Sequence, residues 1–154
     1  MSKEIERKFL VSSADWQSNI YKEYAIKQGY LHSSKELTTR IRTKNDKAFI
    51  TVKGKLEGIS RAEFEYEIPF EDAISLLKLC TNSIIEKTRF EVKIASHVWE
   101  IDVFEGDNKG LIVAEIELSS EDEVFENPNW LGEEVSYDFR YQNACLVEKP
   151  FLEW

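Results

Sequence analysis

The sequence predicts a mainly antiparallel β protein (α+β), an eight-stranded closed barrel with a polar interior and a few flanking helices. Apolar and charged residues alternate with a period of two over most of the chain, turn residues separate the alternating segments, and helical spacing is confined to short stretches. Closure is expected because it removes the exposed edges that an open sheet would present. The predicted strands cover residues 2–11, 23–33, 36–45, 47–55, 60–69, 83–94, 96–105 and 110–119.

The boundaries between these segments have local causes. Asn45 and Asp46 favour a turn between the third and fourth predicted strands. Pro69 ends the fifth strand, because proline cannot donate a ladder hydrogen bond. The glycine-containing run 105–110 indicates a turn before the last strand. These residues therefore divide the alternating pattern into separate strands.

Helical spacing is clearest over residues 71–80. Residues 71–80 carry apolar positions three and four apart, with Glu71 and Asp72 in the first turn, where the helix dipole favours acids. Cys80 lies on this apolar stripe and is interpreted as a core thiol. Further short helices are expected over 13–21 and 138–148, and a helix start is expected at Glu121 after two serines that can cap it.

Length and charge limit the classes of function. A chain of 154 residues with 42% apolar and 32% charged residues predicts one globular domain over 1–154. Twenty basic against 29 acidic residues leave a net charge of −9, which disfavours extended nucleic acid and anionic membranes as partners. The charged N-terminus is unlike a signal peptide, and Cys80 and Cys145 form no disulfide framework. We expect a cytoplasmic protein with reduced thiols.

Familiar catalytic motifs are missing from the sequence. It contains no GxGxxG, GxxxxGK[ST], GxSxG or HExxH motif, and its two histidines, His32 and His97, have no metal-ligand spacing. With only six glycines, the chain has few places for a phosphate-cradling loop. Any phosphate would therefore be bound by side chains, while the abundant carboxylates suit hard cations such as Mg²⁺, Mn²⁺ or Ca²⁺.

The charged positions of the predicted strands are grouped by sign. Glu-x-Glu recurs in three strands, Arg-x-Arg in one and Lys-x-Arg in another. The alternate positions of these strands, on the other face, are rich in aromatic and β-branched residues. One interpretation is that these are the solvated faces of ordinary antiparallel strands. The other is an inverted barrel, whose charged face lines a central passage while the apolar face is covered from outside. Such a passage would attract a metal-bound polyphosphate.

An ordered series of motifs runs along the strands. It opens with ExExK at Glu4-Ile5-Glu6-Arg7-Lys8 and continues through Arg40-Ile41-Arg42, Glu63-Phe64-Glu65, Lys87-Thr88-Arg89 and Glu115-Ile116-Glu117. This series resembles the CYTH superfamily of triphosphate tunnel metalloenzymes, and its length and early ExExK fit the short bacterial members. The resemblance implies an eight-stranded tunnel that binds a triphosphate together with a divalent metal. Members of the superfamily include inorganic and thiamine triphosphatases, class IV adenylate cyclases and RNA 5′-triphosphatases.

The resemblance also implies roles for individual residues. The implied metal ligands, for one or two Mg²⁺ or Mn²⁺ ions, are Glu4, Glu6, Glu63, Glu65, Asp102, Glu115 and Glu117. The implied phosphate ligands are Lys8, Arg40, Arg42, Lys53, Lys87 and Arg89. Lys8, Tyr30 and Glu65 are the implied catalytic residues, with Tyr30 pairing with Lys8. Arg61, Glu67 and Glu100 share the inward positions without an assigned role.

Three functions are compatible with these residues. The first is metal-dependent hydrolysis of inorganic triphosphate to diphosphate and phosphate, with ATP and thiamine triphosphate as other small-molecule substrates. The second is a class IV adenylate cyclase, which converts ATP to cyclic AMP and diphosphate. The third is a non-catalytic barrel that binds polyphosphate or nucleotides. A homodimer is compatible with all three.

Overall fold

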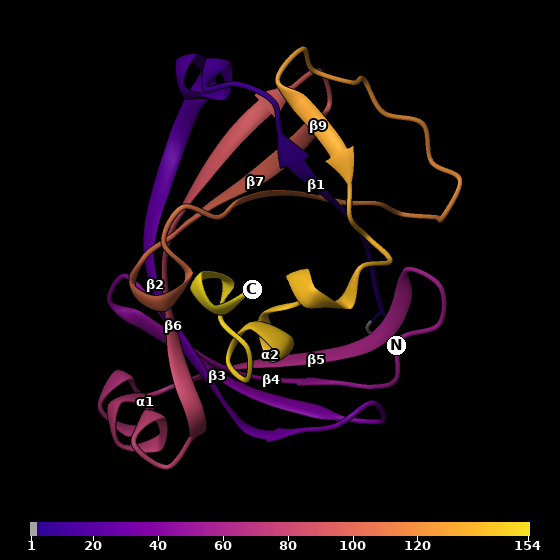
Figure 1. Cartoon of the computed structure of the whole chain (residues 1–154). Helices are drawn as coiled ribbons and strands as arrows, with labels where there is room; N and C mark the ends of the chain where they lie inside the picture. Colours follow the sequence, from indigo (N-terminus) through magenta and orange to yellow (C-terminus); the bar gives the residue numbers. More distant parts are fainter. Residues whose placement is uncertain (1–2) are drawn as a thin grey trace.

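The computed structural model describes residues 3–154, in which one antiparallel sheet curves round and closes on itself (Figure 1). Its strands follow the order β5-β4-β3-β2-β6-β7-β8-β1-β9, and an additional β5–β1 pairing closes the barrel. Eight strands therefore form the barrel, as predicted, and β9 is added outside it. The strands are β1 Lys3–Val11, β2 Ile20–Ser33, β3 Thr38–Lys44, β4 Lys47–Lys53, β5 Ser60–Ile68, β6 Thr81–Ile94, β7 His97–Phe104, β8 Ile112–Glu117 and β9 Leu131–Glu134.

The first strand closes the barrel because it changes partner along its length. Its beginning, Lys3–Ile5, pairs with β5 in the register Glu4↔Arg61. Its middle pairs with β8, where Glu6 lies opposite Glu117 and Lys8 opposite Glu115. Paired residues of antiparallel strands point to the same face. The charged motifs of the first and last barrel strands therefore meet on one side of the sheet.

The helices are shorter than the sequence predicts. The first α-helix, α1, spans Phe70–Leu77 and ends before Cys80. Strand β6 begins directly after Cys80, at Thr81. The expected helix over 138–148 is two separate turns, and only one 3₁₀ turn forms within 13–21. No helix starts at Glu121, and the Ser119 backbone N–H donates to the side chain of Glu123 at 2.6 Å. The remaining helical elements are η1 Asp15–Asn19, η2 Gly106–Asn108, η3 Phe139–Tyr141, α2 Asn143–Leu146 and η4 Phe151–Glu153.

The apolar face of the sheet points outward and is covered in two places. Beneath α1, Ala73 packs on Ile41 and Ala48. On the opposite side the cover is mainly the long segment between β8 and β9, whose Trp130 packs edge-on against Trp99, with 5.5 Å between ring centroids. Both indole rings are buried. The inverted arrangement, with apolar residues outside and charged residues inside, is therefore confirmed.

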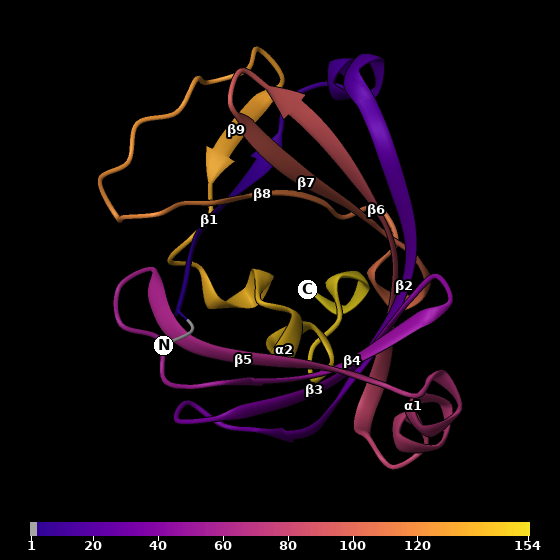
Figure 2. The same ribbon diagram turned by 180° about the vertical axis from the view of Figure 1, so that it is seen from behind.

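The inner face is apolar at one end of the barrel. There Ile85, Phe104 and Val113 form a buried cluster with Leu146 and Val147 from the C-terminal segment. Figures 1 and 2 show this segment, in yellow, lying between the two walls of the barrel. The segment fills this end of the interior, so the charged residues line a chamber next to an apolar plug.

No helix of residues 3–154 is both long and apolar enough to cross a membrane.

An ion pair fixes β9 and the long covering segment to β1. Arg7 donates from Nε and Nη2 to the two oxygens of Glu134, at 2.9 and 2.6 Å, and its guanidinium lies over the Phe125 ring. The hydrogen bond from Arg7 is the main cause that lowers the pKa of Glu134, with a further contribution from Ser136. This pair stabilises the fold at pH values above the ordinary carboxyl range.

Glu134→Gln is expected to lower the free energy of unfolding at pH 7 by about 1 kcal/mol, the upper range for a partly exposed pair. The pKa of Glu134 is lower in the folded protein than in the unfolded chain. The contribution of Glu134 to the free energy of unfolding is therefore present above the unfolded-state pKa, and it is lost as the pH falls through the folded-state pKa. The difference between wild type and variant should therefore shrink in acid. Urea unfolding at pH 7 and in acid measures it. Glu133→Gln, an exposed neighbour, is the control, and an equal loss in both variants would contradict the prediction.

Candidate active site

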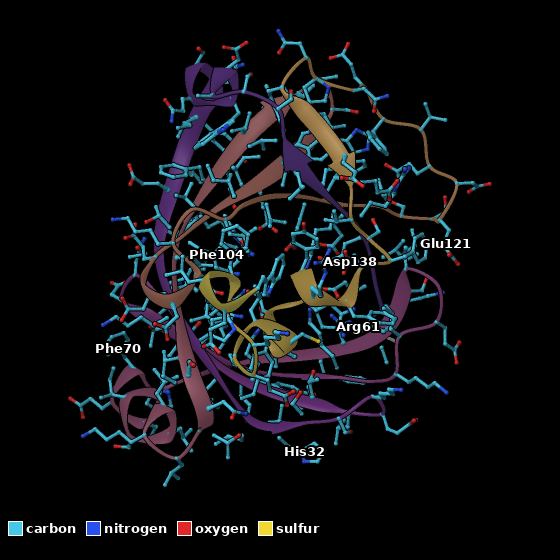
Figure 3. The ribbon with its side chains drawn as sticks, viewed as in Figure 1. His32, Arg61, Phe70, Phe104, Glu121 and Asp138 are labelled. Carbon is cyan, nitrogen blue, oxygen red and sulfur yellow. The ribbon has the colours of Figure 1, made fainter. Side chains whose placement is uncertain are left out.

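A charged chamber with a cavity volume of about 40 Å³ lies in the interior of the barrel. Figure 3 shows side chains projecting into the interior from both walls, with Arg61 on β5 and Phe104 at the end of β7. The chamber is lined by Glu6, Lys8, Tyr30, Thr38, Arg40, Lys53, Arg61, Lys87, Arg89, Glu115, Gln142, Asn143 and Ala144, which come from seven strands and the C-terminal segment.

On the β3–β5 wall, two arginines share one carboxylate. Arg40 and Arg42 donate from Nη2 to Oε2 of Glu65, at 3.4 and 3.3 Å, and the Thr51 hydroxyl donates to the same oxygen at 2.7 Å. Although burial raises it, the pKa of Glu65 is lowered by the Thr51 hydrogen bond and the two guanidinium charges. Burial and the charges of Arg40 and Arg89 lower the pKa of Arg42 to about 9.

The two guanidinium groups keep unused donors. Within the described chain, the buried Nε atoms of Arg40 and Arg42 have no hydrogen-bond partner. An unpaired buried donor is costly, and a phosphate oxygen would supply the missing acceptor. This wall of the chamber is therefore suited to bind an anion.

Where β1, β4 and β5 meet, one carboxylate binds two cations. Lys53 Nζ donates to both oxygens of Glu4, at 3.0 and 2.9 Å, and Arg61 Nε donates at 3.3 Å. Burial opposes ionisation, but the charge of Lys53 dominates and the pKa of Glu4 is lowered to about 2. Burial and the charge of Glu4 raise the pKa of Glu63 to about 7.

On the β6–β7 wall, Asp102 holds the two basic residues of the Lys-x-Arg motif. Arg89 donates to it from Nε and Nη2 at 2.8 and 2.9 Å, and Lys87 Nζ lies 2.8 Å from Oδ2. Asp102 is fully buried. Burial acts to raise its pKa, and the charge of Arg89 is the main cause that lowers it. Burial lowers the pKa of Lys87 to about 8, against the attraction of Asp102. These contacts support a positioning role for Asp102, and its role as a metal ligand stays a prediction.

Lys8 enters the chamber from β1. Its ammonium donates to the Tyr141 carbonyl at 3.1 Å and lies 3.7 Å from Glu115. Tyr30 lines the same chamber, but its hydroxyl accepts from Gln28 at 3.4 Å. The structure thus brings Lys8 and Tyr30 to one chamber, and their direct pairing stays a prediction.

The carboxylates beside Lys8 form an acidic group. Burial and the charges of Glu115 and Glu4 raise the pKa of Glu6 well above its ordinary value. Burial and the charges of Glu4 and Glu100 also raise the pKa of Glu117. Mutual repulsion of this kind is relieved by a cation.

The chemistry of these donors fits a hard divalent cation. Among residues 3–154, however, no three such side chains converge as a ready-made ligand set. Mg²⁺ is commonly held by one or two carboxylates, with waters and substrate phosphates completing its six ligands. The acidic group is therefore suited to a cation that binds together with a phosphate.

The structure brings together most of the residues that the resemblance implies. It also adds inward-facing residues, within and beside the chamber, that sequence analysis missed. Thr51 and Gln28 are buried inward-facing side chains that lie on the same strand faces as Lys53 and Tyr30, and period-2 alternation could have indicated them. Gln142 and Asn143 come from the C-terminal segment, whose folding into the barrel no local pattern predicts.

Comparisons with known proteins agree with this geometry. The chain is 46% identical over 152 residues to an inorganic triphosphatase of Acetivibrio thermocellus, a match that covers 98% of this chain and 97% of that protein. It is 36% identical over 148 residues to an inorganic triphosphatase of Nitrosomonas europaea, covering 94% and 96%.

Solved structures support the same relationship. The crystal structure of the inorganic triphosphatase NE1496 superposes with a TM-score of 0.66 at 32% identity, covering 96% of this chain and 95% of that one. The CYTH domain model matches residues 2–149, nearly the whole chain. A closed barrel with a charged interior, strong sequence identity and this match lead to one assignment, and the chain belongs to the CYTH domain family.

Proposed function

We propose that this protein hydrolyses inorganic triphosphate to diphosphate and phosphate inside the barrel, with Mg²⁺ or Mn²⁺ as cofactor. The observation that carries the proposal is the chamber itself, in which basic side chains from several strands face a group of carboxylates. A triphosphate carries about four negative charges near neutral pH, so the basic wall supplies its main attraction. Relatives of 46% and 36% identity named inorganic triphosphatases support the choice of substrate.

The division of the chamber suggests how the reaction is promoted. Arg40, which lines the chamber, and Arg42, which shares Glu65 with it, would bind phosphoryl oxygens through their free Nε donors. Lys87 and Arg89 would do so from the β6–β7 wall. A water molecule would attack the terminal phosphorus as the bridging P–O bond breaks, and the diphosphate would leave with that bridging oxygen.

The carboxylates would hold the cofactor. Glu4, Glu6 and Glu117 would bind one ion, and Glu63, Glu65, Asp102 and Glu115 would serve a second ion. A bound divalent ion supplies charge neutralisation at the phosphates and lowers the pKa of bound water.

The two free cysteines, Cys80 and Cys145, support a reducing compartment, and we propose the cytoplasm.

A substrate screen tests this function. Purified protein is incubated with triphosphate, ATP or thiamine triphosphate, with Mg²⁺, Mn²⁺ or a chelator, and all products are identified. We expect metal-dependent phosphate and diphosphate release, greatest with triphosphate. Cyclic AMP from ATP would replace this proposal with a cyclase, and tight triphosphate binding without turnover would replace it with a non-catalytic binder.

A further inference from the structure

The C-terminal segment contacts the chamber through two lysines. Lys87 Nζ donates to Oδ1 of Asn143 at 3.0 Å, and Lys8 Nζ donates to the Tyr141 carbonyl at 3.1 Å. Both lysines line the chamber together with Asn143 itself. Residues far from the charged strands in sequence therefore touch two of the cations that would bind phosphate.

The ammonium of Lys87 is held more completely than that of Lys8. It is almost fully buried, it lies 2.8 Å from Asp102, and it sits over the Phe104 ring at 5.3 Å from the centroid. An ammonium has three N–H donors. Asp102 and Asn143 accept two of them, so the direction of the third is set by tetrahedral geometry. Asn143 thus limits how Lys87 can meet a ligand.

The position of Asn143 does not depend on Lys87. The helix α2 that begins at Asn143 is anchored by Leu146 and the following Val147, both buried in the apolar plug. Beyond them, the Phe151 backbone N–H donates to the side chain of Asn108 at 2.8 Å. Because the plug holds the segment, Asn143 is a fixed acceptor toward which the flexible lysine is drawn.

We propose that Asn143 is a positioning residue for substrate binding, which holds the Lys87 ammonium in the direction that meets a phosphate of the bound triphosphate. This inference rests on the function proposed above and deepens it. Lysine side chains lose much rotamer freedom when they bind a ligand, and a fixed acceptor removes that cost in advance. The same contact would be inhibitory if substrate had to displace Asn143, but the buried plug opposes that displacement.

The test compares two asparagines of the same chain. Asn143→Ala removes the acceptor for Lys87, and Asn108→Ala removes the acceptor that holds the end of the segment. Initial rates with triphosphate give KM and kcat, and thermal unfolding reports the fold. Asn143→Ala is expected to raise KM by about 10- to 100-fold, the scale of one hydrogen bond to a charged group, with a smaller change in kcat. Asn108→Ala is expected to lower the unfolding temperature and leave KM unchanged.

Two further variants ask whether Asn143 acts through Lys87. Asn143→Gln keeps an amide acceptor and is expected to recover most of the lost affinity. In a Lys87→Met background, Asn143→Ala is expected to have little further effect on KM, because the residue it positions is gone. If Asn143→Ala does not fold, Asn143→Leu keeps the side-chain volume without the acceptor and takes its place.

Each other outcome overturns the inference. An unchanged KM in Asn143→Ala means that Lys87 needs no positioning, and a lower KM means that the contact is inhibitory. An equal rise of KM in Asn108→Ala means that docking of the segment matters and Asn143 does not. An undiminished effect in the Lys87→Met background means that Asn143 acts elsewhere. If wild-type protein does not hydrolyse triphosphate, the proposed function fails separately, and calorimetric triphosphate binding by the same variants still tests the role of Asn143.

Discussion

Replacing Arg42 by methionine is expected to lower kcat/KM for triphosphate by about 10²- to 10³-fold, the cost of removing one preorganised donor from a transition state. The same change is expected to leave the ligand-free protein at least as stable as wild type. Activity is lost while stability is kept because the Arg42 guanidinium is positioned to bind an anion, and the ligand-free protein contains no such anion. Its Nε has no acceptor within the described chain, and burial together with the positive charges of Arg40 and Arg89 lowers its pKa.

The stability of the Arg42→Met protein follows from its surroundings. Glu65 loses one of its partners but keeps the Thr51 hydroxyl and Arg40. It is also partly exposed, so no isolated buried charge is left behind. A buried, repelled cation is exchanged for an apolar side chain of similar length, which removes the cost of burying its charge.

Rates and thermal unfolding, each measured with and without triphosphate, check both signs. Arg140→Met is the matched control, because Arg140 binds the exposed Asp138 outside the chamber. It should change neither kcat/KM nor the stabilisation by triphosphate. A large loss of stability in ligand-free Arg42→Met would contradict the prediction, since it would mean that Arg42 is held by contacts of the free protein.

The alternation along the strands was sufficient to predict the strands of the barrel and which side chains share a face. Arg40 and Arg42 share one face because the chain between them is extended, and Glu65 meets them beside Thr51 because β3, β4 and β5 pair in simple register. Glu63 lies opposite Lys53 in the same register. These are consequences of a period-2 pattern and short turns. The pattern cannot say which face is inside, and the series of motifs decided that question.

Other parts depend on contacts that are distant in sequence. Strand β9 has four residues, Leu-Gly-Glu-Glu, without apolar alternation, and forms where Arg7 binds Glu134 and Gly132 lies against the Leu10 carbonyl. A side chain at Gly132 would come within 2.8 Å of that oxygen. Asn143 likewise reaches the chamber only because Leu146 and Val147 find an apolar end of the barrel. Neither position carries a local signal.

Glu6→Gln is expected to abolish the stabilisation of the protein by Mn²⁺ and to lower kcat by about 10³-fold or more, as loss of a metal that stabilises transferred phosphate would. Burial and the negative charges of Glu115 and Glu4 oppose the ionisation of Glu6. A cation bound there would turn this repulsion into attraction. The neutral amide keeps the size of the side chain but removes the charge that would bind the ion.

The ligand-free Glu6→Gln protein should be as stable as wild type, because removing one member of a like-charged group relieves repulsion. Unfolding temperatures with and without Mn²⁺, together with calorimetric titration, measure the change. Wild-type protein should gain stability with metal concentration as expected for a ligand that binds only the folded state. Glu71→Gln is the control, since Glu71 is exposed on α1, outside the barrel. Mn²⁺ binding by Glu6→Gln with wild-type affinity would place the cation elsewhere, because a carboxylate that can be neutralised without effect on affinity is not a ligand.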